Sequence, residues 1–315
     1  MKKIAFFATA LAALTLFSSC QKKEKKVKIG VIQLVEHPAL DKNYQGFVDG
    51  LKNAGFVDGE NIVIDYENAQ GEQANCVTIA QKLVNDRSDL IFAIATPAAQ
   101  AVANMTSEIP ILVSSVTDPK TAQLVESNEK PNTNVSGTSD LTPCAAQISL
   151  LKRLIPNAKK VAILFCSSEE NSRFQANLAE AACKYEGLDF VEATVSNTNE
   201  VQQVVQSLVG KVDAIYAPTD NMIASSMATV ALVTTPNKIP VICGEEGMVE
   251  GGGLATYGIN YYELGLQTAK MAVEILKGGK KPADMPIQYL EKCDFSYNKE
   301  VAAELGIQIP ADLIK

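Results

Sequence analysis

Short β-rich runs alternate with longer segments of helical periodicity along most of the chain. Residues 27–34 (VKIGVIQL) have the composition of a buried strand. The segment that follows starts at Pro38 and repeats apolar residues every three to four positions: Leu40, Tyr44, Phe47, Val48 and Leu51. Strands that alternate with helices form parallel sheets covered on both faces. The pattern therefore predicts an α/β fold.

The alternation occurs in two series, which predicts two Rossmann-like lobes with parallel sheets. A polar, turn-rich segment at residues 132–140 (NTNVSGTSD) separates the series, and a further helix–strand unit follows at residues 261–290. A single lobe does not need that extra unit, so we expect the chain to cross between the lobes three times, at hinges near residues 137–140, 258 and 290. The expected lobes are residues 27–138 with about 259–288, and residues 139–258 with about 289–315.

The first twenty residues have the order of a secretory signal. Lys2 and Lys3 precede an apolar run at residues 4–17, and two serines then precede Cys20. Small residues before a cysteine resemble the lipobox of bacterial lipoproteins. That likeness implies a signal peptide at residues 1–19, lipidation of Cys20 by acyl chains such as palmitate, a polar tether at residues 20–26, and a protein anchored on the extracytoplasmic face of the cell membrane. Ordinary cleavage, with an unmodified Cys20, is the alternative.

Charge and cysteine spacing exclude several kinds of partner. Without residues 1–19, 26 basic and 36 acidic side chains remain, a formal net charge of −10, which argues against nucleic acid. The chain has no CxxC pair and a single histidine, so we expect neither a zinc site nor a cofactor. Free thiols are favoured over disulfides at six positions that are far apart in sequence: Cys76, Cys144, Cys166, Cys183, Cys243 and Cys293.

Several phrases together resemble the substrate-binding lipoproteins of ABC importers, and more narrowly the branch that binds tryptophan or tyrosine. They are QLVEHPALD (33–41), GFVDGENIVIDY (55–66), ATPAAQ (95–100), TDP (117–119), NVSGTSD (134–140), PTDN (218–221) and GEEGMVEGGGLATYGINYY (244–262). The resemblance implies a periplasmic-binding-protein type I architecture. It also implies capture of an amino acid between two closing lobes and delivery to an ABC permease and its ATPase.

Ligands of open α/β sheets bind at the carboxyl ends of parallel strands. Applied to this sequence, the rule selects thirteen candidate ligand-binding residues: Gln33, Glu36, His37, Thr96, Ala98, Ala99, Ser115, Thr117, Ser168, Asn171, Asp220, Asn221 and Glu245. The helix that we expect to start at Thr96 would offer backbone N–H groups to a carboxylate. Asp220 or Glu245 would receive an ammonium group.

Each of these assignments has a structural alternative. Thr96 and Asp220 are also suited to be helix N-caps, and His37, which precedes a proline, to be a cap or a surface residue. An enzyme is disfavoured, because no G-x-S-x-G motif occurs and Ser168 lies in the lobe opposite the only histidine. The functional alternatives are a receptor of the same fold for a nucleoside or sugar, and a secreted enzyme or adhesin.

Overall fold

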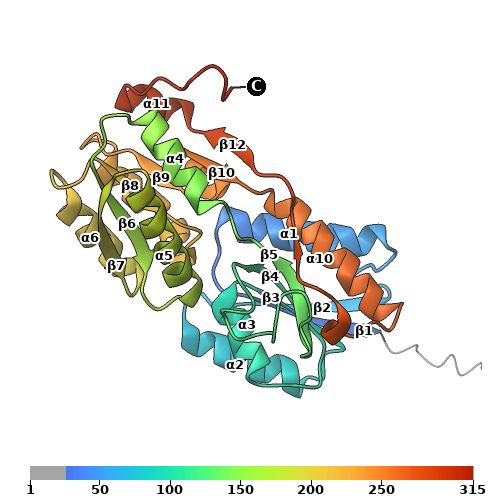
Figure 1. Cartoon of the computed structure of the whole chain (residues 1–315). Coiled ribbons are helices and arrows are strands. Elements are labelled where there is room, and N and C mark those ends of the chain that lie inside the picture. Colours follow the sequence, from blue (N-terminus) through green and yellow to red (C-terminus); the bar gives the residue numbers. More distant parts are fainter. Residues whose placement is uncertain (1–25, 315) are drawn as a thin grey trace, which may run out of the picture.

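The computed structural model describes residues 26–314, in which two lobes lie side by side, each built on a six-stranded sheet (Figure 1). The six strands of the first sheet are all parallel. Their order across the sheet is β11 (Gln288–Tyr289), β5 (Val135–Ser139), β4 (Ile111–Val116), β3 (Leu90–Ile94), β1 (Val27–Gln33) and β2 (Ile62–Asn68). The helices of this lobe are α1 (Pro38–Asn53), α2 (Gln73–Asn85), α3 (Thr96–Ala103), α10 (Tyr261–Leu276) and the 3-10 turn η2 (Pro282–Asp284).

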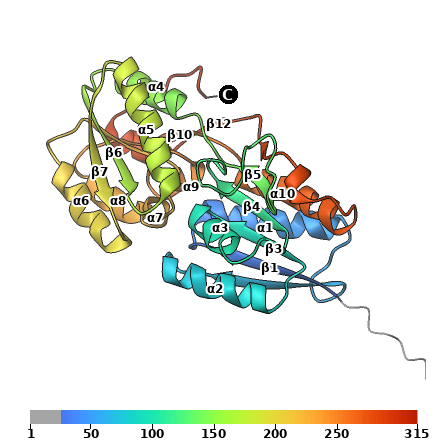
Figure 2. The ribbon, with the colours of Figure 1, turned by 60° about the horizontal axis from the view of Figure 1, so that its bottom comes forward.

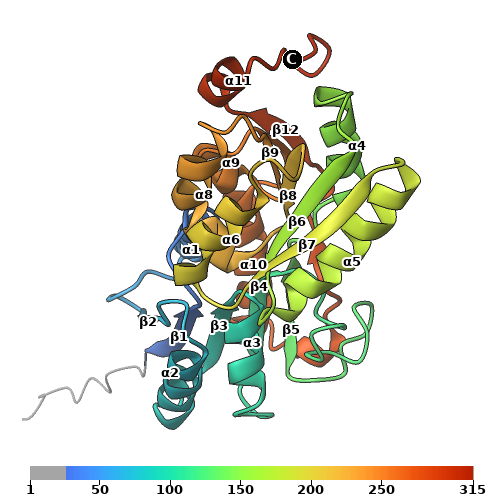
Figure 3. The ribbon, with the colours of Figure 1, turned by 90° about the vertical axis from the view of Figure 1, so that its left-hand side faces the viewer.

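The second sheet is parallel except at one edge, where β12 runs antiparallel to β10. Its order is β12 (Asp294–Tyr297), β10 (Ala255–Gly258), β9 (Val241–Cys243), β8 (Ala214–Ala217), β6 (Lys160–Cys166) and β7 (Asp189–Val195). The helices of this lobe are α4 (Cys144–Leu154), α5 (Glu170–Tyr185), η1 (Thr198–Glu200), α6 (Val201–Leu208), α7 (Asn221–Ser225), α8 (Met227–Thr234), α9 (Glu246–Glu250) and α11 (Lys299–Leu305). Figure 3 shows α11 and β12 at the end of the molecule farthest from α2.

The chain passes between the two sheets three times. It leaves the first sheet after β5, returns after β10 to form α10, and crosses back between β11 and β12. Three connecting segments of this kind allow one lobe to rotate against the other without breaking either sheet. No helix of residues 26–314 combines the length and the apolar character needed to cross a membrane.

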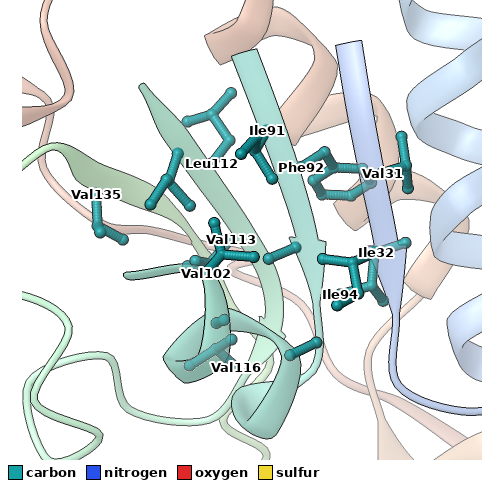
Figure 4. Packing of buried hydrophobic residues seen from close by; sticks show 14 of the residues in the cluster. Val31, Ile32, Ile91, Phe92, Ile94, Val102, Leu112, Val113, Val116 and Val135 are labelled. Atoms are coloured by element: carbon teal, nitrogen blue, oxygen red, sulfur yellow. The ribbon is translucent and has the colours of Figure 1, made fainter. Parts of the chain in front are cut away.

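Each lobe has its own hydrophobic core, because its strands are apolar on both faces. In the first lobe, Phe92 of β3 stacks on Phe47 of α1, with ring centroids 4.0 Å apart. On the other side of the sheet, Val102 of α3 packs against the strands (Figure 4). Both faces are therefore buried, as a parallel sheet requires.

The contact between α1 and α10 joins segments that are distant in sequence, and Figure 1 shows these two helices side by side. A Cβ atom at Gly46 would lie 2.0 Å from the backbone oxygen of Tyr262, and one at Gly265 would lie 2.0 Å from the backbone oxygen of Asn43. The two glycines therefore permit the close approach of the helices. This contact packs α10 onto the first lobe.

Local structure differs from the sequence-based expectations in several places. Thr96 is the first residue of α3 rather than its cap; the N-cap is Ala95, which has a φ of 81°. The apolar pattern of residues 222–233 predicts one helix, but the structure divides this segment at Ser226 into α7 and α8. The strand expected at residues 286–290 pairs only at Gln288 and Tyr289, and β12 was not expected.

The six cysteines at positions 76 to 293 are all free thiols. Cys20 and its tether lie outside the described residues, apart from Lys26.

Candidate ligand-binding site

A cavity lies at the border between the lobes, at the carboxyl ends of the strands. Figure 2 shows α7 and α9 of the second lobe at this border, next to the first lobe. The cavity volume is only about 10 Å³, which is room for about one water. A larger ligand therefore needs its walls to move apart. The lining residues are His37, Leu40, Ser115, Thr117, Asp140, Asn171, Thr219, Asp220, Asn221, Ala224, Glu245 and Tyr261.

Hydrogen bonds between the lobes surround the cavity. The amide of Gln175 donates to the hydroxyl of Thr117 over 3.2 Å, and His37 Nε2 lies 3.4 Å from Asn221 Oδ1. Nearer the surface, Lys42 pairs with Glu250 at 2.8 Å and the amide of Gln100 donates to Glu170 at 2.8 Å. These bonds connect the two lobes on several sides of the cavity.

Asp220 and Glu245, the two carboxylates expected to receive an ammonium group, both cap helices. Asp220 accepts from the backbone N–H of Ile223 at 2.8 Å and of Cys166 at 2.6 Å, one to each oxygen. Glu245 accepts from Gly247 and, at 2.7 Å, from Met248, again one to each oxygen. Burial raises the pKa of Asp220 and raises that of Glu245 to about 7. Their backbone bonds limit these shifts.

Glu169 lies behind the cavity wall and orients two of its asparagines. Its carboxylate accepts from the side-chain amides of Asn221, at 2.5 Å, and Asn171, at 3.2 Å. Because both amide nitrogens point to Glu169, both side-chain oxygens point away from it. Burial, followed by repulsion from Asp220, raises the pKa of Glu169. The hydrogen bonds from the two amide groups oppose this shift.

The orientation of Asn221 in turn determines the tautomer of His37. Asn221 Oδ1 is an acceptor, so the hydrogen bond requires a proton on His37 Nε2, which leaves Nδ1 as an acceptor. Burial lowers the pKa of His37 to about 4, and the bond to Asn221 opposes the shift. His37 is therefore neutral at physiological pH.

Four buried polar atoms of the cavity residues have no hydrogen-bond partner among residues 26–314. They are His37 Nδ1, Ser115 Oγ, Asp140 Oδ1 and Asn171 Oδ1. Three of them are acceptors, and only the serine hydroxyl also donates. Ser115 has a φ of 54°, in the left-handed region that non-glycine residues rarely adopt. Such strain and unmet hydrogen bonding are typical of functional sites.

The cavity brings together seven of the thirteen candidate residues, namely His37, Ser115, Thr117, Asn171, Asp220, Asn221 and Glu245. The other six do not line it. Gln33 is buried and donates to Asp41 and to the backbone of Val35. Glu36 and Ser168 are exposed. Thr96, Ala98 and Ala99 are buried in α3. Their roles in ligand binding stay predictions.

Sequence reasoning did not name Asp140 and Tyr261 as site residues, although both line the cavity. The Tyr261 hydroxyl donates to Asp140 Oδ2 at 2.8 Å. Both residues lie on segments where the chain crosses between lobes, Asp140 directly after β5 and Tyr261 at the start of α10. The expected hinge at residues 137–140 was the one signal for Asp140. Leu40, Thr219 and Ala224 complete the unpredicted part of the wall.

Comparison with known proteins identifies one family and a curated relative that binds an amino acid. Residues 28–315 match the family described as ABC transporter substrate binding protein. The chain is 45% identical over 293 residues to a tyrosine-binding protein of Clostridioides difficile, covering 93% of this chain and 85% of that protein.

Two solved structures are similar in sequence and fold. One is an ABC domain in complex with L-Trp from Streptococcus pneumonia, with 41% identity and a TM-score of 0.89, covering 92% of this chain and 98% of that one. The other is a ligand-free, open structure of a substrate binding protein with adhesive properties from Clostridium difficile. It has 47% identity and a TM-score of 0.69, and the match covers 91% of this chain and 97% of that one.

Proposed function

We propose that this chain, which belongs to the ABC transporter substrate binding protein family, captures an aromatic amino acid, tyrosine or tryptophan, between its two lobes. The observation that carries the proposal is the cavity at the lobe border, whose polar walls come from both lobes and from two crossing segments. A ligand bound there contacts both lobes and stabilises their closure. The likeness to a tyrosine-binding protein and to a domain in complex with L-Trp supports an aromatic side chain.

The contrast between the two similar structures supports closure on a ligand. The chain has the higher sequence identity to the open, ligand-free protein, yet it has the higher TM-score with the L-Trp complex. Sequence divergence alone would give the opposite order. The difference is explained if the lobes of this chain stand in the closed arrangement, which agrees with the hydrogen bonds of Thr117 and His37 across the border.

The ligand is proposed to lie with its carboxylate near Ser115 and Thr117, in the direction of the α3 start at Thr96–Ala103. The ring then lies between the lobes, near residues 35–37 and 168–171. The unpartnered hydroxyl of Ser115 is available to donate to a carboxylate oxygen. Binding without catalysis is sufficient for this role.

Isothermal calorimetry with a panel of solutes tests the proposal. We expect one site that binds L-tyrosine or L-tryptophan at least tenfold more tightly than L-leucine, because an aromatic ring buries more apolar surface. The chain contains no tryptophan, so emission of bound L-tryptophan gives an independent readout. Equal affinity for L-leucine contradicts the aromatic assignment. Binding of a nucleoside or sugar instead of any amino acid contradicts the whole proposal.

The family is extracytoplasmic, and we propose that a lipid on Cys20 anchors this chain to the membrane beside its ABC permease and ATPase. Acyl chains on one cysteine, each stabilised by about 0.8 kcal/mol per buried CH₂, hold a protein on a bilayer. Cys20→Ala is expected to move the protein from the membrane fraction to the soluble fraction. A variant that remains with the membrane contradicts the anchor.

A further inference from the structure

The unpartnered polar atoms of the residues that line the cavity are mostly acceptors. His37 Nδ1 is an acceptor because Nε2 carries the proton, and Asn171 Oδ1 is one because its amide nitrogen donates to Glu169. Asp140 Oδ1 is an acceptor when the carboxyl is ionised. A ligand group that satisfies these atoms must bring several hydrogens. An ammonium group brings three, together with a positive charge.

Three carboxylates line the cavity, and their hydrogen bonds distinguish them. Each oxygen of Asp220 and of Glu245 already accepts a backbone N–H. Asp140 Oδ2 accepts from the Tyr261 hydroxyl, and the Thr117 hydroxyl also interacts with this carboxylate, but Oδ1 has no partner at hydrogen-bond distance within residues 26–314. Asp140 is only 5% exposed, so its carboxylate is shielded from bulk solvent. Asp140 is thus the carboxylate with an unused, buried oxygen.

No lysine or arginine of the described chain forms an ion pair with Asp140. Isolated carboxylates are costly to bury, and proteins normally pair them. Burial accordingly raises the pKa of Asp140 to about 6, while hydrogen bonds from Tyr261 and Thr117 limit the shift. A cation supplied by the ligand would pair this charge.

We infer that Asp140 is the residue that receives the ammonium group of the bound amino acid, through its unpartnered Oδ1 atom in the cavity at the lobe border. The inference rests on the proposed function and deepens it, because it assigns ammonium recognition to a crossing segment rather than to Asp220 or Glu245. Asp140 and its partner Tyr261 belong to two of the three segments that connect the lobes. The ligand is therefore held by the hinge itself.

The test compares L-tyrosine with its analogue lacking the amino group, 3-(4-hydroxyphenyl)propionate, by calorimetry. The wild type is expected to prefer L-tyrosine strongly. Asp140→Asn keeps the shape of the side chain and removes the charge, so L-tyrosine affinity is expected to fall about 30-fold or more. Affinity for the analogue should stay within about threefold. The preference for the amino group is then largely lost.

Asp220→Asn and Glu245→Gln are the matched controls. Each is expected to lower thermal stability, because a helix cap is weakened. Each should also lower the affinities for L-tyrosine and for the analogue by similar factors, so that the ratio of the two affinities stays close to that of the wild type. The inference is overturned if either control removes the preference while Asp140→Asn retains it. Failure of the wild type to bind L-tyrosine or L-tryptophan overturns the proposed function instead.

A crystal structure of the wild type with L-tyrosine gives a test that does not depend on folding of a variant. We expect the ligand nitrogen within 2.7–3.2 Å, the usual hydrogen-bond range, of Asp140 Oδ1. A nitrogen that contacts Asp220 or Glu245, but not Asp140, overturns the inference and leaves the proposed function intact.

Discussion

Glu245 is fully buried, and each of its oxygens accepts a backbone N–H at the start of α9. Burial raises its pKa to about 7, while the two backbone bonds act against the shift. In the unfolded chain an ordinary glutamate titrates near 4.3. Between these values the folded protein binds a proton that the unfolded chain does not. The stability from this proton is therefore lost as pH rises through about 7.

We predict that the free energy of unfolding of the ligand-free protein rises by roughly 1 kcal/mol between pH 8 and pH 6.5 through Glu245 alone. The raised pKa of Glu169 acts in the same direction. His37 opposes them as the pH falls toward its unfolded pKa of about 6.5, because its folded pKa is lowered to about 4. Urea unfolding at the two pH values measures the difference. Glu245→Gln should show a smaller rise, and an unchanged rise in this variant contradicts the assignment.

At the residue scale, the rule that ligands bind at the carboxyl ends of parallel strands predicted much of the cavity wall. It succeeded for Ser115, Asn171 and Asp220 because the carboxyl ends of parallel strands meet at one edge of each sheet. It missed Asp140 and Tyr261 because crossing segments reach the cavity only through the arrangement of the two lobes. That arrangement depends on contacts between distant residues, which local sequence patterns do not encode.

At the element scale, the packing of α1 against α10 depends on Gly46 and Gly265. We predict that Gly46→Ala lowers the free energy of unfolding by about 1–3 kcal/mol, because the added methyl group meets the backbone oxygen of Tyr262. Backbone atoms cannot rotate away as a side chain can. Gln45→Ala, at an exposed position of the same helix, is the control, with an expected change within about 0.5 kcal/mol. Equal effects of the two substitutions contradict tight packing.

Most helices and strands were predictable because their apolar periodicity is strong. The exceptions lie where the apolar pattern gives no signal. β12 (Asp294–Tyr297) is only partly buried at a sheet edge, and it is recognised by its antiparallel pairing with β10 (Ala255–Gly258). The division between α7 and α8 falls at Ser226, within a segment that remains apolar on both sides. The expected extent of each lobe stays a proposal, although the sheets define three crossings.

At the scale of the whole molecule, the closed arrangement is held by few bonds between the lobes, and the outer ones are exposed. In the Lys42–Glu250 pair, the side chains are 45% and 49% exposed. Exposed ion pairs of this kind contribute about 0–1 kcal/mol. Because such contacts are weak, we predict that the ligand supplies most of the stabilisation of the closed arrangement.

Small-angle X-ray scattering with and without ligand tests most directly whether the two lobes close on an aromatic amino acid. With saturating L-tyrosine or L-tryptophan, we predict a smaller radius of gyration than that of the ligand-free protein, with the two lobes drawn together around the ligand. With L-leucine at the same concentration, the curve of the ligand-free protein should persist. A radius of gyration that no aromatic amino acid changes, or that L-leucine lowers equally, contradicts the account.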